Sequence, residues 1–443
     1  MPRPAATGRT DDPGVAEPGR MWTRGHDRAV ERIRSMIDGR TPHAIVISGP
    51  AGIGKTTLAL DLAAGLLCDD PDPAARPCRA CRGCRLVERG RHPDVHRLAP
   101  SGPGDQIRIG TRDRPEDGTV RRLASELILM AVEGKTRLAI IERADRLTED
   151  AQTALLKTLE EPPAGVTIVL CADDEDRLLP TVRSRSARIR LGPVATRDIE
   201  AILTEAGVAE PPLAARLARI VAGRPGAARN LARAPAALAA RDEIARSLLD
   251  LLAATAAPRL AAARDLTARA MDLVRALDRA AIADDGPVGA GPGSPTRGRG
   301  KAKGAVAADR TVAPPAAADL ANGDESAGEG GDTTDEPGAS RTSVPAAERR
   351  RAAAVVVVLW RELARDLLIV TLGEERQVRD PALLDDLRLA AAQLDSPGDR
   401  PRAAALGAFL GRLETAGELL EANVRPELVL DSLLLHWPRV DPG

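Results

Sequence analysis

Aromatic residues are nearly absent from this sequence. Its 443 residues include three tryptophans, one phenylalanine and no tyrosine, so aromatic side chains make up 1% of the chain. The cores must therefore be built from leucine, isoleucine, valine and alanine, which favours helices and parallel strands and argues against an aromatic-rich β-sandwich. Hydrophobic residues nevertheless amount to 43%, which suffices for two or three domains with cores of their own.

Lysine is also scarce, and the charges of the two signs nearly cancel. The chain has five lysines among 63 basic residues, and its formal net charge is −1. No field of the whole protein therefore attracts this chain to nucleic acid, so a stand-alone DNA-binding protein fits the composition poorly. Lys55 and Lys157 fall inside the two most motif-like stretches, which makes them candidates for a specific role.

Long hydrophobic runs are missing as well. The longest apolar run, Ala352–Trp360, is about half of the roughly 18–20 residues that a membrane span needs. The amino terminus is polar and rich in proline and glycine, unlike a signal peptide. We therefore expect a soluble, cytoplasmic protein, whose five cysteines are thiols or metal ligands rather than disulfides.

One stretch matches the complete phosphate-loop (P-loop) motif. An apolar strand at 44–47 runs into Gly49–Thr56, which fits G-x-x-x-x-G-K-[ST], and a helix is expected at 58–67. Glycines let backbone N–H groups turn towards a phosphate, Lys55 would reach the β- and γ-phosphates, and Thr56 would hold Mg²⁺. The alternative is a chance glycine-rich turn without function. The flanking strand and helix argue against it, because the phosphate-loop mechanism requires both.

A second stretch, Leu138–Leu191, predicts the rest of a parallel sheet. Its apolar runs at 138–141 and 166–171 are separated by a helical segment that two prolines end at 162–163. Strand, helix and strand in this order form a βαβ unit with parallel strands. A further helix is expected at 120–132. The phosphate loop and this unit together predict an α/β domain with a nucleotide site at the carboxyl edge of its sheet.

Cysteines form the third motif. Four thiolates are the ligand set that structural zinc prefers, and the spacing here supplies them from Cys68, Cys78, Cys81 and Cys84. Such a site has no open position for water, so its expected role is to pin a loop. Free thiols and an iron–sulfur cluster are the alternatives. His92 and His96 are rival ligands that a complete four-cysteine shell does not need.

Three further stretches, Gly90–Val95, Ala154–Pro163 and Leu178–Ser186, complete a recognisable set. Together with the phosphate loop and the cysteine insertion at 68–84, they resemble the delta-prime family of bacterial DNA polymerase III clamp-loader subunits, AAA+ proteins related to gamma/tau. The resemblance extends over about 22–235. It implies an AAA+ P-loop domain with a helical lid and an all-α C-terminal collar domain.

The resemblance also implies the partners. They are the gamma/tau and delta subunits, with which the chain would form a hetero-pentamer. Through this complex the chain would act on the sliding clamp and primed DNA, and no membrane is involved. The chain would then be a subunit of the DNA-directed DNA polymerase III holoenzyme, a nucleotidyltransferase complex. No paired-metal carboxylate site is evident, so polymerase chemistry would belong to another subunit.

Patterning along the chain and the resemblance together predict the domain order. The segment at 284–347 is crowded with glycine, proline, serine, threonine and aspartate, so it cannot bury enough apolar surface to offset its ordering entropy. The expected parts are a disordered leader at 1–20, the AAA+ domain at 21–195, the lid at 196–240, the collar at 241–283 and 348–443, and a disordered insert at 284–347.

Departures from the family's ATPase pattern predict poor or absent hydrolysis. Glu142 and Arg143 stand where an active site has the Asp that holds Mg²⁺ and the Glu that activates water. Glu142 could still reach a metal, but a guanidinium stays protonated and cannot act as a general base. Asp173 stands near the sensor of the γ-phosphate. The lid's sensor arginine corresponds to Gly226, with Arg229 as a displaced candidate.

Arg185, within Ser184-Arg185-Ser186, corresponds to the arginine finger that clamp-loader subunits present to a neighbour's nucleotide. The finger acts in trans, so a loss of self-hydrolysis need not remove this role. The alternative is that Arg183 and Arg185 only cap a helix. The expected site residues are Arg185 as the finger, then Gly49, Gly52, Gly54, Lys55, Thr56, Thr57 and Glu142 for ATP with Mg²⁺, and the four cysteines for zinc.

These expectations describe a stator, a static subunit that supports ATP-dependent loading of the sliding clamp onto primed DNA. The first alternative is an active, gamma/tau-like AAA+ ATPase motor, against which Arg143 argues. The second is a zinc-stabilised adaptor in which nucleotide has no role.

Overall fold

The computed structural model describes residues 19–101, 105–111, 116–133, 136–284, 345–394 and 402–439. Nearly all of the predicted leader at 1–20 and of the predicted insert at 284–347 lies outside these described residues. Within the described ranges, no helix combines the length and the hydrophobicity that crossing a membrane requires.

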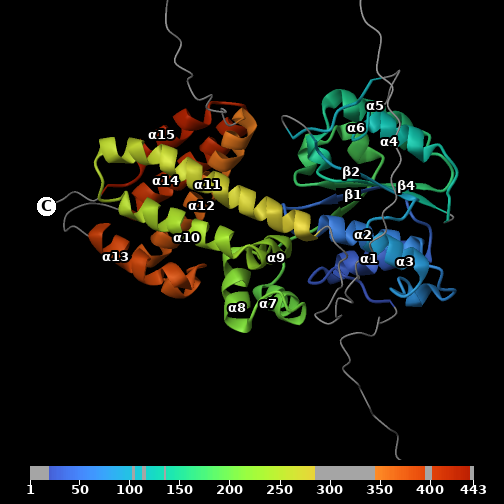
Figure 1. Ribbon diagram of the computed structural model, residues 1–443, viewed down its shortest axis with the longest axis horizontal. Coiled ribbons are helices and arrows are strands. Elements are labelled where there is room, and N and C mark those ends of the chain that lie inside the picture. Colours follow the sequence, from blue (N-terminus) through green and yellow to red (C-terminus); the bar gives the residue numbers. More distant parts are fainter. Residues whose placement is uncertain are drawn as a thin grey trace, which may run out of the picture. The chain divides into compact units, whose positions relative to one another are not determined.

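Five parallel strands form one sheet in the amino-terminal part of the chain (Figure 1). They lie in the order β2-β3-β4-β1-β5, and every neighbouring pair is parallel. The central strands β1, β3 and β4 are buried along their whole length, as expected when helices cover both faces. The strands are β1 (Ala44–Ser48), β2 (Val95–Leu98), β3 (Arg137–Ile141), β4 (Val166–Ala172) and β5 (Ala187–Arg190).

Two apolar clusters, one on each face, attach helices to this sheet. Side chains alternate along a strand, so Ile45 and Ile47 of β1 join one cluster and Ala44 and Val46 join the other. The first cluster includes α1 (Asp27–Asp38), α2 (Lys55–Leu66) and α3 (Arg82–Glu88). The second includes α4 (Val120–Leu127), α5 (Glu149–Glu160) and α6 (Pro180–Ser184).

Helix α4 is shorter than the apolar pattern at 120–132 predicted, since it ends at Leu127. Two buried side chains from outside this segment take up its backbone groups. Asp94 accepts hydrogen bonds from the N–H groups of Val132 (2.7 Å) and the next residue (2.9 Å). Arg137 donates to two carbonyl oxygens of the same segment. The chain therefore leaves the helix because its hydrogen bonds are satisfied by distant residues.

All remaining elements among the described residues are helices or short helical turns (Figure 1). One apolar cluster holds the lid helices α7 (Thr196–Glu205), α8 (Pro211–Ile220) and α9 (Pro225–Arg233). Another holds α10 (Pro235–Asp250), α11 (Ala256–Asp284), α12 (Ala346–Thr371), α13 (Leu384–Leu394), α14 (Arg402–Glu421) and α15 (Pro426–His436), which we call the collar helices. The predicted fold class, an α/β P-loop domain with a helical lid and a helical C-terminal region, is confirmed.

Three of the four aromatic residues gather among the collar helices. Trp360, Phe409 and Trp437 contact one another, with ring centroids 4.7–5.4 Å apart. The Trp437 indole N–H donates to the carbonyl of Leu248 (2.9 Å). The fully buried Arg259 donates to carbonyl oxygens at the carboxyl ends of α10 and α15, where the partial negative charge of a helix end favours a cation.

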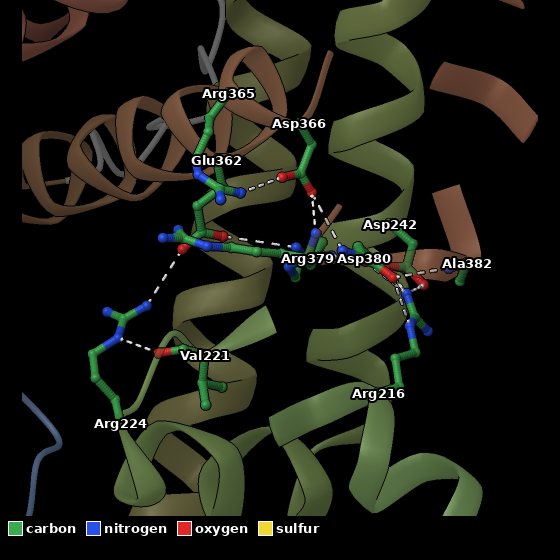
Figure 2. Close-up of polar contacts among 11 residues, drawn as sticks. Arg216, Val221, Arg224, Asp242, Glu362, Arg365, Asp366, Arg379, Asp380 and Ala382 are labelled. Carbon is green, nitrogen blue, oxygen red and sulfur yellow. Dashed lines mark hydrogen bonds and ion pairs between the residues drawn. The ribbon is translucent and has the colours of Figure 1, made fainter. Parts of the chain in front are cut away.

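A buried polar network connects the lid with the collar helices (Figure 2). Arg216 of α8 donates to Asp242 of α10 (2.7 Å) and to Asp380 (3.0 Å), which precedes α13. Arg241 of α10 donates to the same Asp380 (2.6 Å). Arg224, just before α9, donates to Glu362 of α12 (3.3 Å). Asp380 is thus shared by two guanidinium groups from the lid and from the collar helices.

Burial and the ion pairs together set the pKa values of the carboxyl groups in this network. Burial raises the pKa of Glu362 and of Asp366, against the charges of nearby arginines or backbone hydrogen bonds. Burial alone would also raise the pKa of Asp380, but hydrogen bonds from Arg216 and the charges of Arg216 and Arg241 hold it below its usual value. Asp380 therefore stays ionised and is the anionic centre of the network.

Replacing Asp380 by alanine is expected to lower the free energy of unfolding by about 3–5 kcal/mol, because the buried Arg241 and the half-buried Arg216 lose their shared partner. The matched control is Asp386→Ala, whose ion pair with Arg246 is exposed (side chains 43% and 52% exposed) and should contribute about 1 kcal/mol or less. Urea unfolding followed by circular dichroism measures both variants.

The effect of Asp380→Ala should also depend on pH. A carboxylate whose folded pKa is depressed stabilises the protein above its unfolded pKa, and this contribution is lost as the pH falls through the folded pKa. The difference between wild type and Asp380→Ala should therefore shrink below the ordinary value of 3.8. Equal losses for the Asp380 and Asp386 variants near neutral pH would contradict the central role of Asp380.

Candidate functional site

The phosphate loop joins β1 to α2 at the carboxyl edge of the sheet (Figure 1). Gly49, Gly52 and Gly54 have φ angles of 148°, 76° and 110°, a region that side chains with a Cβ rarely adopt. At Gly49 a Cβ would also lie 2.4 Å from the carbonyl oxygen of Leu191. Helix α2 begins at Lys55, and the N–H groups of a first turn have no partner within their helix. The loop therefore has the backbone geometry of an anion site.

The Lys55 ammonium is engaged within the protein. Its Nζ lies 2.6 Å from Oδ1 of Asp173 and donates to two carbonyl oxygens of the loop at 2.7 and 2.9 Å. The Lys55 side chain is 7% exposed and that of Asp173 is 28% exposed. Asp173 follows β4, whose register places Ala172 opposite Ser48, so it emerges beside the loop. The lysine that was predicted to reach phosphates holds a carboxylate here.

Glu142 and Arg143 follow β3 at the same edge of the sheet, and both are paired. Oε1 of Glu142 accepts from the guanidinium of Arg97 on β2 (2.7 Å). Arg143 forms an ion pair with Asp105, and its Nε lies 4.0 Å from Oδ2 of Asp173. Glu142, which could still reach a metal by the sequence analysis, is thus neutralised by an arginine, and Arg143 places a cation where the water-activating base was expected.

The lid approaches the phosphate loop through Gly226. Its N–H donates to the carbonyl oxygen of Gly52 (2.9 Å), and a Cβ at Gly226 would lie 3.0 Å from that oxygen. An arginine at this position would therefore require α9 and the loop to move apart by a few tenths of an ångström. Arg229, the displaced candidate, lies on α9 and is half-buried.

Two acidic residues that the sequence did not single out accept hydrogen bonds at the carboxyl edge of the sheet. Asp145 accepts a hydrogen bond from the N–H of Asp173 (2.8 Å), and Glu175 accepts one from the Ser48 hydroxyl (2.9 Å). An acidic residue shortly after a buried strand was the available signal. Parallel topology brings the residues after β1, β3 and β4 to one edge, so these groups meet there.

The four cysteines form a compact cluster. Their Sγ atoms all lie within 4.8 Å of one another, and those of Cys68 and Cys81 are 4.0 Å apart. Sulfur atoms of a tetrahedral site with bonds of about 2.3 Å lie about 3.8 Å apart, so the arrangement fits a metal ion. Backbone N–H groups donate to the sulfurs of Cys68, Cys78 and Cys81 at 3.3–3.4 Å, which stabilises thiolates. These residues could hold a metal.

The rival histidine ligands are engaged elsewhere. Nδ1 of His92 accepts from the N–H of Asp94 (3.1 Å), and Nδ1 of His96 lies 3.0 Å from a carboxylate oxygen of Glu126. Burial lowers the pKa of His92, so its ring stays neutral and acts as a buried acceptor. Neither histidine belongs to the group of possible metal ligands that the described residues form.

Arg185 follows α6 at the protein surface, with 38% of its side chain exposed. Its guanidinium lies 2.8 Å from a carboxylate oxygen of Glu160 and donates to the carbonyl of Thr181 (3.2 Å). The second contact is the helix-capping interaction of the alternative interpretation. Arg183 pairs with Asp176 instead. Both side chains of the Arg185–Glu160 ion pair are therefore open to solvent.

Comparison with known sequences relates the amino-terminal part of the chain to one family. Residues 25–195 match the family model described as DNA polymerase III, delta subunit. The DNA polymerase III subunit delta' of Pseudomonas aeruginosa is 38% identical over 153 residues, 34% of this chain and 44% of that protein. That of Escherichia coli is 36% identical over 197 residues, 44% of this chain and 56% of that protein.

The tau subunit of Salmonella typhimurium is also similar, with 34% identity over 183 residues, 40% of this chain and 27% of that protein. The chain spans about half the length of the delta' relatives that it matches. The predicted relationship to the delta-prime subunits of the DNA polymerase III clamp loader, and more distantly to gamma/tau, is therefore confirmed for this region.

Comparison with solved structures matches the chain to a gamma-subunit-related protein from Thermotoga maritima. It has 15% identity and a TM-score of 0.39, with 92% of this chain and 98% of that chain covered. A RuvB variant from the same organism has 17% identity and a TM-score of 0.31, with 47% and 59% covered.

Proposed function

We propose that this chain is a delta-prime-like clamp-loader subunit that acts as a stator in the cytoplasm. It would hold gamma/tau and delta subunits in register within a hetero-pentamer and lend Arg185 to ATP on a gamma/tau neighbour. The assembly would then place the sliding clamp on primed DNA. The proposal is carried by one contrast: the chain's own phosphate loop is paired internally, whereas Arg185 lies exposed.

The chemistry of the two arginines supports this division. Arg143 stands where a general base is needed, and a guanidinium cannot accept the proton of an attacking water. Arg185 needs no base beside it, because a guanidinium that acts in trans stabilises charge on the transferring phosphoryl group of another active site. Its ion pair with Glu160 is exposed on both sides, so a partner's phosphate could replace the carboxylate at little cost.

Substituting Arg185 by alanine should reduce ATP turnover severalfold in a complex reconstituted with gamma/tau, delta, clamp and primed DNA. The reason is that the ATP site beside Arg185 loses the guanidinium that stabilises charge on its transferring phosphoryl group. Arg183→Ala is the matched control, since Arg183 leaves the same helix but pairs with Asp176, and it should retain wild-type turnover. Assembly of each complex is checked by gel filtration.

Unchanged turnover with Arg185→Ala would leave only the helix cap as its role. Turnover by the isolated chain that Lys55→Ala abolishes would instead establish an ATPase motor. Wild-type loading by complexes with Lys55→Ala and Arg185→Ala together would support an adaptor that uses neither site.

We also propose that Cys68, Cys78, Cys81 and Cys84 bind one structural zinc ion. Burial raises the pKa of Cys84, so a thiolate at that position needs a nearby cation, and zinc supplies one while it deprotonates its ligands. Four sulfurs leave no open position for water. The ion would therefore hold the segment between α2 and α3 against the sheet and take no part in catalysis.

The purified chain should contain about one equivalent of zinc by elemental analysis. Cys84→Ser should lose most of the metal and lower the melting temperature, since a ligand is removed from a closed shell. Cys171→Ser is the control, because burial raises the pKa of that thiol to about 12 and it lies in β4 rather than in the cluster. Its zinc content should not change. Four free thiols with little metal, or visible absorption from iron and sulfide, would contradict zinc.

A further inference from the structure

Two cations of the nucleotide site converge on a single carboxylate. Lys55 Nζ lies 2.6 Å from one oxygen of Asp173, and Arg143 Nε lies 4.0 Å from the other. At 4.0 Å the guanidinium N–H is too far for a hydrogen bond, and among the described residues this buried Nε has no hydrogen-bond partner. The Arg143 Nε–H group therefore lies near the Asp173 carboxylate without a hydrogen-bond acceptor.

The backbone holds Arg143 in this position. Its φ and ψ angles are 51° and 52°, a left-handed conformation that few residues other than glycine adopt. On its other side the guanidinium is paired with Asp105. A strained residue that presents a cation to a phosphate loop is a functional feature rather than a random surface charge.

The acidic residue that the motif offers as a metal ligand is already paired. Two guanidinium nitrogens of Arg97 lie 2.7 Å from Oε1 of Glu142. Mg²⁺ at a nucleotide site normally uses one or two carboxylates together with phosphate oxygens. Mg²⁺ at Glu142 would have to displace Arg97, whereas Arg143 Nε has no hydrogen-bond partner to lose among the described residues.

We propose that Asp173 is an internal anion that stands in for a phosphate group, and that this site takes a nucleoside triphosphate without a divalent metal. Arg143 supplies the second positive charge that Mg²⁺ provides in related sites. A triphosphate would displace the Asp173 carboxylate and meet the Lys55 ammonium and the Arg143 guanidinium, which suits phosphate geometry. This inference deepens the proposed function, because it rests on the phosphate loop of a stator that does not hydrolyse ATP.

Competition by Asp173 has a quantitative consequence. A ligand that must first open an internal ion pair binds with an apparent affinity reduced by the fraction of molecules in which the site is open. Removing the charge of Asp173 while keeping its shape should therefore raise affinity. Asp173→Asn leaves the backbone N–H that donates to Asp145 in place, so the segment keeps its anchor.

The test is ATP binding by the full-length isolated chain, measured by calorimetric titration in buffers with Mg²⁺ or with EDTA. Asp173→Asn should tighten binding severalfold in both buffers. The matched control is Asp174→Asn, which changes the neighbouring, exposed aspartate. Asp174 accepts from the N–H of Asp176 (2.9 Å), a bond that the asparagine oxygen can keep, and pairs with Arg177 (3.8 Å). This variant should bind like wild type. Arg143→Ala should weaken binding in EDTA more than in Mg²⁺, because the metal can then replace the lost cation.

Three outcomes would overturn the proposal. They are no gain in ATP affinity with Asp173→Asn, loss of ATP binding by the wild type in EDTA, and no ATP binding by either the wild type or Asp173→Asn. Circular dichroism checks folding, and Asp173→Ser provides a second variant if the asparagine variant is unstable. Failure of the stator proposal would appear only in the reconstituted complex, so the two proposals are tested separately.

Discussion

The parallel pairing of β1 with β4 is the constraint on which the candidate site depends. Its register sets Ser48 opposite Ala172, so the next residue of each strand begins the phosphate loop on one side and is Asp173 on the other. Lys55 reaches Asp173 only because of this register. A shift by one residue would turn every side chain of the strand to the opposite face and would break the two apolar clusters.

Much of the fold followed from local patterns in the sequence. The fully apolar runs at 44–47, 138–141 and 166–171 became β1, β3 and β4 because a buried parallel strand needs apolar side chains on both faces. Strands β2 and β5 were missed, since their sequences mix charged and apolar residues and both lie at sheet edges. Edge strands are exposed on one side, so composition identifies them poorly.

The partners of the charged residues could not be predicted in the same way. The motif identified Lys55, Glu142 and Arg143, but their partners Asp173, Arg97 and Asp105 lie 38 to 118 positions away in the sequence. Those contacts depend on strand order and register, which composition does not encode. Helix α4 ended early for the same reason, because Arg137 binds a carbonyl of its last turn and Asp94 binds backbone N–H groups of the segment that follows it.

Burial distinguishes Lys55 from Arg185 as cations that the chain could offer to a nucleotide. The Lys55 side chain is 7% exposed, so opening its ion pair leaves a buried charge to be compensated, and breaking such pairs is costly. The Arg185 side chain is 38% exposed and its partner Glu160 is 49% exposed, and exposed pairs contribute about 1 kcal/mol or less. Arg185 can therefore exchange its carboxylate for a phosphate at little cost, whereas Lys55 can do so only for a ligand that replaces all the interactions it loses. This asymmetry supports the proposal that the chain acts on a neighbour's nucleotide rather than on its own.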